Sequence, residues 1–205
     1  MMENVFHLKT LKSGLRCVSI AVLAILIWGC ESTPKKGQGN QGESAVMSLT
    51  SANMQKYQSA MSSLANKKPE AAEQVLQQLV LVRPDIAEVW INLALSQYQQ
   101  KHFDHAKMSI ENLNEQMGGL AESYNLLGLI AVEQGEFSKA ENFYKKAIEM
   151  KPKYSNALFN MALLQDVYFQ RISLAVKYYE RYSELMPQDK DTLNWTNGLK
   201  MSLEQ

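Results

Sequence analysis

The sequence is poor in cysteine and histidine, the side chains that most often hold metals or act as nucleophiles. Both cysteines, Cys17 and Cys30, lie among the first 30 residues, and the whole chain has 3 histidines. The remainder of the chain can therefore form neither a disulfide nor a thiolate metal site. It also lacks a phosphate-binding loop, a dinucleotide-binding glycine motif and a serine–histidine–aspartate set. We expect no enzyme, no metal site and no bound cofactor.

The chain also lacks an excess of charge of one sign. Its 21 basic residues are matched by 21 acidic residues, so the formal net charge is zero. Proteins that bind nucleic acid usually carry a basic excess that meets the phosphates, and we expect no such binding here. The hydrophobic fraction of 46% is typical of a chain with a packed core.

The first thirty residues have the three zones of a secretory signal. Lys9, Lys12 and Arg16 supply positive charge, residues 17–28 are almost wholly apolar, and a small residue precedes Cys30. As a helix the apolar run would reach roughly 18 Å, whereas a bilayer core is about 30 Å thick, so a permanent membrane span is disfavoured. Residues 27–30, Ile-Trp-Gly-Cys, resemble the lipobox of bacterial lipoproteins, with a bulkier second residue than is usual.

This resemblance implies a signal peptide over 1–29 and a covalent lipid on Cys30. Glu31 stands where aspartate retains enteric lipoproteins in the inner membrane. The resemblance therefore implies the periplasmic face of the outer membrane, with the outer leaflet of the inner membrane as the alternative. Residues 30–46 are rich in glycine, serine, glutamine and charge, which predicts a flexible linker. We expect a folded domain over 47–205.

Small and aromatic residues recur through this domain about every 34 residues. The clearest unit is 121–154, and its recurring residues are Tyr124, Leu127, Gly128, Ala140, Tyr144, Ala147 and Pro152. This pattern resembles the tetratricopeptide repeat, a pair of helices joined by a tight turn. Matching residues in the second and fourth units are Trp90, Ala94, Ala106, Ala162, Ala175 and Pro187. We expect repeats at about 53–86, 87–120, 121–154 and 155–189, and a capping helix over 190–203.

The resemblance implies an all-α fold, in which antiparallel helix pairs stack into a right-handed superhelix closed by the C-terminal helix. Small residues such as Gly128 and Ala140 would let the two helices of a pair approach closely. One residue more than the usual period separates Ala162 from Ala175. We therefore expect a longer or bulged turn near residues 168–173.

In tetratricopeptide proteins the first helix of each repeat lines a concave groove that binds peptides. The corresponding positions here are mostly apolar, with a few acids and amides, which suits a peptide anchored by apolar side chains. The predicted groove residues are Ile91, Leu95, Tyr98, Asn125, Leu129, Glu133, Phe159, Leu163 and Asp166. None is basic, which disfavours the carboxylate-gripping function of some family members. We expect about half of the groove positions to pack between helices instead.

Two other groups of side chains have a structural and a functional interpretation. His102 and His105 are three residues apart and could share a helix face, but no third ligand is nearby, so a surface pair is favoured over a metal site. Aromatic residues also gather in the last repeat: Phe159, Tyr168, Phe169, Tyr178, Tyr179 and Tyr182. Most are expected to pack against the cap, and any that stay exposed would form a patch for a partner.

These features predict a non-enzymatic lipoprotein scaffold that binds proteins or peptides in the cell envelope. Its layout is similar to that of tetratricopeptide lipoproteins that support type IV or tight-adherence pili, or that escort secretins. Two alternatives stay open within this class: an accessory of a Ton/Tol-like energy-transducing complex, and a docking adaptor for peptidoglycan hydrolases. A spacer without a ligand is a further interpretation. The sequence leaves the oligomeric state open.

Overall fold

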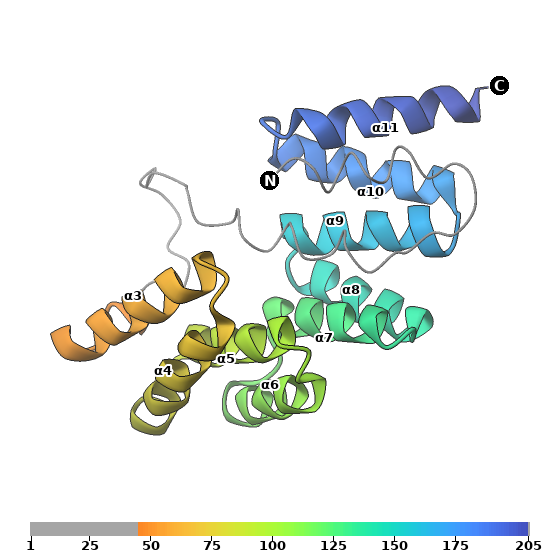
Figure 1. Cartoon of the computed structure of the whole chain (residues 1–205). Coiled ribbons are helices and arrows are strands. Elements are labelled where there is room, and N and C mark those ends of the chain that lie inside the picture. The colour runs from red at the N-terminus through yellow and green to blue at the C-terminus, as the bar shows by residue number, and fades with distance from the viewer. Residues whose placement is uncertain (1–44, 205) are drawn as a thin grey trace. The chain divides into compact units, whose positions relative to one another are not determined.

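The computed structural model describes residues 45–204, and helices fill most of this part of the chain (Figure 1). Over these residues there are nine α-helices, one π-helical turn and no strand. The elements are α3 (Ser51–Ala65), α4 (Pro69–Val82), α5 (Ala87–Gln99), α6 (Phe103–Met117), α7 (Ala121–Glu133), α8 (Phe137–Met150), α9 (Ser155–Leu163), η2 (Leu164–Tyr168), α10 (Ile172–Leu185) and α11 (Lys190–Leu203). None of these helices is both long and apolar enough to cross a bilayer.

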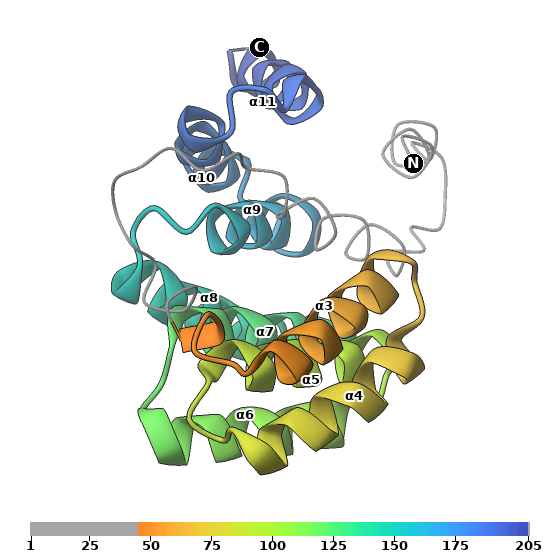
Figure 2. The ribbon, with the colours of Figure 1, turned by 90° about the vertical axis from the view of Figure 1, so that its left-hand side faces the viewer.

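The chain divides into two compact units after Met117. In unit 1, α3 packs on α4 and α5 on α6, and α4 also contacts α5. In unit 2, α7 packs on α8 and α9 on α10, while α8 contacts α9 and α10 contacts α11 (Figures 1 and 2). The prediction of an all-α fold built from helix pairs, with a further helix at the C-terminal end, is confirmed.

One residue in each turn between paired helices has a left-handed backbone. Lys67, Lys101 and Gly135 occupy this position in the first three pairs, with φ of 56°, 63° and 74°, and Gln170 occupies it in the fourth with φ of 54°. Glycine adopts this conformation at little cost, whereas other residues are disfavoured there. The turn geometry is therefore kept in all four pairs, although only one pair has the glycine.

Buried alanines mark the places where paired helices approach one another. Ala94, Ala106, Ala140, Ala162 and Ala175 all have no exposed surface. In α7 a Cβ added to Gly128 would overlap the ring of Tyr144, a fully buried side chain of α8. Larger side chains at these positions would push the paired helices apart, because the protein interior between them is closely packed.

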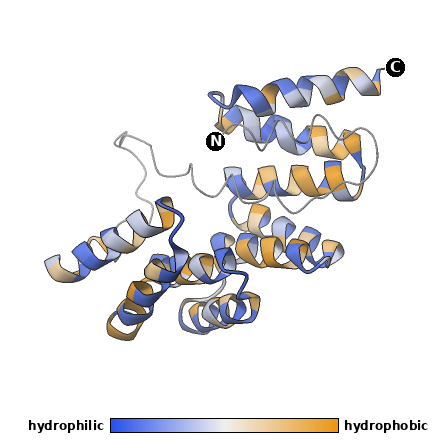
Figure 3. Cartoon of the chain, in the orientation of Figure 1, coloured by the Kyte–Doolittle hydropathy of each residue, from blue (hydrophilic) through white to orange (hydrophobic). Residues whose placement is uncertain are grey.

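The extra residue of the fourth repeat lies inside a helix. Residues Leu164–Tyr168 form a π-helical turn directly after α9, and this turn absorbs the additional residue before the chain reaches α10. The bulge that we expected in the connecting turn near 168–173 is thus centred earlier, because widening one helical turn keeps Ala162 and Ala175 in register. The α9 helix, which leads into this turn, consists mainly of hydrophobic residues, whereas α3 is more hydrophilic (Figure 3).

The crossing of α7 and α8 makes a testable prediction. Replacing Gly128 with alanine should lower the free energy of unfolding by about 1–3 kcal/mol, because the added methyl group overpacks the Tyr144 ring. Gly198→Ala in α11 is the matched control, since a Cβ there meets open space. The control should gain about 0.5–1 kcal/mol from better helix propensity alone. Urea denaturation measures both, and a neutral Gly128→Ala would contradict the close crossing.

Candidate partner-binding site

In unit 1 two of the predicted groove residues, Ile91 and Leu95 of α5, stay partly exposed, and a hydrogen bond joins α5 to α3. The Asn92 Nδ2 group of α5 donates a hydrogen bond of 2.9 Å to the hydroxyl of Tyr57 in α3. Both helices carry half-buried apolar side chains, most of which pack against the core of unit 1. We call this set the open face: Met54, Tyr57, Met61, Ile91 and Leu95. Tyr98, also predicted for the groove, is only 3% exposed, and its ring lies tilted against Phe103 with the centroids 6.0 Å apart.

In unit 2 most of the predicted groove residues are buried. Leu129 is 1% exposed, and Asn125 and Phe159 are also buried. The Asn125 Oδ1 atom accepts a hydrogen bond of 2.9 Å from Asn160. Only Glu133 and Leu163 remain half-exposed. The register position of Ile91 is therefore buried in unit 2, at Asn125 and Phe159, whereas the position of Leu95 is buried at Leu129 and half-exposed again at Leu163.

Asp166, the last predicted groove residue, holds the C-terminal helix. It lies in the π-helical turn, where its Oδ2 atom accepts hydrogen bonds from the Trp195 Nε1–H group at 2.9 Å and from the Tyr179 hydroxyl at 3.4 Å. Burial and the nearby Asp166 carboxylate raise the pKa of Tyr179, so its hydroxyl stays a proton donor at neutral pH. Asp166 is thus tied to α10 and α11.

The structure divides the predicted aromatic group into two parts. Phe159, Tyr179 and Tyr182 are buried and pack edge to face, with ring centroids 5.8 and 5.1 Å apart. Tyr168, Phe169 and Tyr178 are half-buried. Tyr168 stacks on Phe137 at 4.2 Å, and burial, aided by Glu133, raises the pKa of Tyr168 to about 12. The first part is core, while the second lies at the surface.

Polar pairs between successive repeats were not predicted from the sequence. Gln97 of α5 donates to Glu73 of α4 at 3.1 Å, and two repeats later Gln165 donates to Glu141 at 2.7 Å. The Asn92–Tyr57 and Asn160–Asn125 bonds recur with the same spacing. Each unit therefore has the same Gln–Glu bond and, at matching positions, an asparagine that donates to the preceding repeat. The signal in the sequence was a Glu and a Gln 24 residues apart, at matching positions of the first and third repeats.

The corresponding positions of the second and third repeats hold different residues. Ala131 stands in place of the glutamine and Lys107 in place of the glutamate, while Ile91 and Leu126 replace the second pair. Alanine, isoleucine and leucine have no hydrogen-bonding side-chain group. The sequence thus repeats neither polar pair between the second and third repeats.

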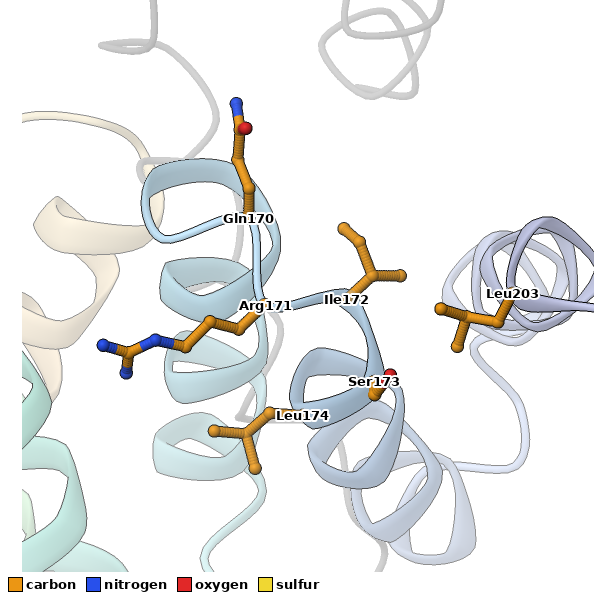
Figure 4. A pocket seen from close by; sticks show the side chains of 6 residues that line it. All are labelled: Gln170, Arg171, Ile172, Ser173, Leu174 and Leu203. Carbon is orange, nitrogen blue, oxygen red and sulfur yellow. The ribbon is translucent and has the colours of Figure 1, made fainter.

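Other candidate sites offer little chemistry. His102 and His105 are exposed with ring centroids 5.7 Å apart, and no group of three metal-ligating side chains occurs within 45–204. A shallow, open hollow of about 450 Å³ lies where α10 begins, with Ile172 and Leu203 on either side (Figure 4). Its lining is Gln170, Arg171, Ile172, Ser173, Leu174 and Leu203. Cys30 lies outside the described residues.

Comparison with protein families identifies the repeats. Residues 121–154 and residues 57–106 each match a tetratricopeptide-repeat family model, so these segments are tetratricopeptide repeats. The chain is 46% identical over 41 residues to the Protein O-mannosyl-transferase Tmtc3 of Drosophila melanogaster, and 43% identical over 47 residues to the Uncharacterized protein ycf37 of Pyropia yezoensis. The matches take in 20% and 23% of this chain, but only 4% and 26% of those proteins.

Solved structures share the fold at low sequence identity. A thermophilic TPR protein of Thermus thermophilus has a TM-score of 0.64 at 19% identity, over 78% of this chain and 87% of that one. MamA has a TM-score of 0.55 at 16% identity, over 71% and 84%. A tetratricopeptide repeat protein from Parabacteroides merdae reaches 0.55 at 16%, over 73% and 59%. These similarities establish the architecture.

The hydrogen bonds of Asp166 make a second prediction. Asp166→Leu should lower the free energy of unfolding by about 1–3 kcal/mol, because it leaves two donors without their acceptor. The indole N–H signal of Trp195 in NMR should also exchange faster with water. Glu184→Leu, at an exposed acid of α10, is the control and should change neither quantity. A Trp195 signal that stays protected in Asp166→Leu would show that α11 is held by other contacts.

Proposed function

We propose that the chain is a non-enzymatic, lipid-anchored scaffold that binds a protein partner through the open face of unit 1. The observation that carries this proposal is that Ile91 and Leu95 keep part of their apolar side chains exposed on neighbouring turns of α5. Asn125 and Phe159, which hold the register position of Ile91 in unit 2, are buried. Apolar groups on a surface of fixed shape are the anchors that peptide-binding grooves use.

The open face is held rigid before any partner arrives. The Asn92–Tyr57 bond joins α5 to α3, and Glu73 accepts hydrogen bonds from Gln97 and Gln100 at 3.1 and 2.6 Å, which joins α5 to α4. A surface whose helices are already fixed loses little conformational entropy on binding. This preorganisation favours a specific partner over a loose apolar contact.

The envelope location rests on the sequence. The basic, apolar and small-residue zones before Cys30 support export and lipidation, and Glu31 favours the periplasmic face of the outer membrane. Tethered there, the open face would hold a component of an envelope machine, and the layout is similar to that of lipoproteins of pilus or secretin assembly. We therefore propose that the scaffold supports the assembly or positioning of such a complex.

Lipid anchoring is tested at Cys30. Cys30→Ala removes the thiol that would carry the acyl chains, and each buried methylene contributes about 0.8 kcal/mol to membrane binding. The variant should either leave the membrane pellet or accumulate as the larger precursor that keeps its signal peptide. In both cases it should no longer incorporate labelled palmitate. Cys17→Ala is the matched control and should leave both readouts unchanged. Palmitate incorporation by Cys30→Ala would refute lipidation at this residue.

The open face is tested by charge substitution. Leu95→Asp should abolish a discrete crosslink formed in cells from a photoreactive residue at Gln99, a half-exposed neighbour on α5, because a carboxylate cannot replace an apolar anchor. Leu81→Asp is the control: Leu81 of α4 is 84% exposed and lies outside the open face. Circular dichroism should show equal helicity in both variants. A crosslink that survives Leu95→Asp would move the binding surface elsewhere.

A further inference from the structure

Glu88 and Glu122 occupy the same position in successive repeats but have different surroundings. Each is the second residue of its helix, Glu88 in α5 and Glu122 in α7. The Glu122 Oε1 atom forms an ion pair of 2.8 Å with the Lys151 Nζ atom, within unit 2. The Glu88 Oε2 atom, within unit 1, is buried and accepts no hydrogen bond. One acid is therefore paired with a cation of the chain, and the other keeps a buried oxygen without a donor.

The sequence explains the missing partner. Lys151 lies one repeat after Met117, so methionine stands in unit 1 where unit 2 has its lysine. Arg83, the cation that precedes α5 in the chain, bonds instead to Asp85 at 2.8 Å and to Ser48. The helix dipole favours an acidic residue in the first turn of α5, and this accounts for the negative charge of Glu88. It does not supply a hydrogen bond to the Glu88 Oε2 atom.

Glu88 belongs to the same stripe of α5 as the open face. Ile91 and Leu95 follow it by three and seven residues, the spacing of side chains on one side of a helix. Asn92, one turn after Glu88, reaches across to Tyr57 of α3. Because Glu88 as a whole is only half-buried, a ligand lying along the open face would meet apolar side chains and, at one end, the Glu88 side chain, whose carboxylate would turn outward to present its Oε2 atom.

We propose that the open face binds a peptide segment that combines apolar anchors with a lysine or arginine, and that this cation pairs with Glu88. The ligand would supply the charge that Lys151 supplies to Glu122 within the chain. An ionised pair of this kind forms a shorter and stronger hydrogen bond than neutral groups do. The inference rests on the proposed function, since it names the chemistry of the partner that the open face selects.

Matched peptides test the charge preference. Fluorescein-labelled 15-residue peptides with leucine anchors at varied spacing would carry lysine, norleucine or glutamate at one central position. For the full chain in detergent, fluorescence anisotropy should give about tenfold tighter binding for lysine than for norleucine, as expected for one charge-assisted hydrogen bond. The glutamate peptides should bind most weakly. Glu88→Gln should erase the lysine preference, and Glu122→Gln should retain it.

A second variant supplies the cation from the chain itself. Met117→Lys places a lysine where unit 2 has Lys151, so Glu88 should gain an internal partner. Lysine and norleucine peptides should then bind this variant with about equal affinity, and the norleucine peptides should bind it as tightly as they bind the unmodified protein. Met108→Lys on the exposed side of α6 adds the same charge elsewhere and should leave the preference intact.

The outcomes separate this inference from the proposed function. If lysine and norleucine peptides bind equally, or if the preference survives Glu88→Gln, the pairing with Glu88 is refuted while peptide binding by the open face stands. If no peptide of the panel binds, or if Leu95→Asp leaves binding unchanged, the proposed function is refuted as well. Loss of the lysine preference in both Glu88→Gln and Met117→Lys, with intact norleucine binding, supports the pairing.

Discussion

The close approach of paired helices at small side chains is the constraint on which the rest of this structure depends. Five alanines at equivalent crossing positions have no exposed surface, and Gly128 leaves room for the ring of Tyr144 in α8. Once the spacing between helices is fixed in this way, the register of every other side chain follows. Equivalent residues of the first helices therefore recur from repeat to repeat. The side chains around each of them determine whether it is buried in the core or remains exposed for a partner.

The two units use this shared architecture differently. In unit 2, Leu129, Phe159 and Asp166 are enclosed, and Glu122 has an internal lysine. In unit 1, Ile91 and Leu95 remain half-exposed and the Glu88 Oε2 atom has no donor. The Gln–Glu bond that fastens the repeats within each unit is the same. We therefore attribute the proposed binding by unit 1, and its absence from unit 2, to a few side chains on the same repeated arrangement of helices.

Periodicity was sufficient to predict the helix pairs, because only small residues permit their close crossing. It could not predict exposure: Leu95 and Leu129 are the same residue at the same register position, yet one is half-buried and the other fully buried. Exposure depends on which side chains surround a position, and those come from other helices. The polar pairs escaped prediction for the same reason. The extra residue was recognised, but its π-helical turn lies before the expected loop.

Methyl-detected NMR of the full chain, titrated with a leucine- and lysine-containing peptide, shows directly whether α3 and α5 form the binding surface. We predict that the shifted methyl signals belong to the aliphatic residues of the open face, Met54, Met61, Ile91 and Leu95. The signals of Leu129 and Met161, which are buried in unit 2, should stay in place. Shifts confined to unit 2 or to the second helices of the pairs would contradict a binding surface on α3 and α5.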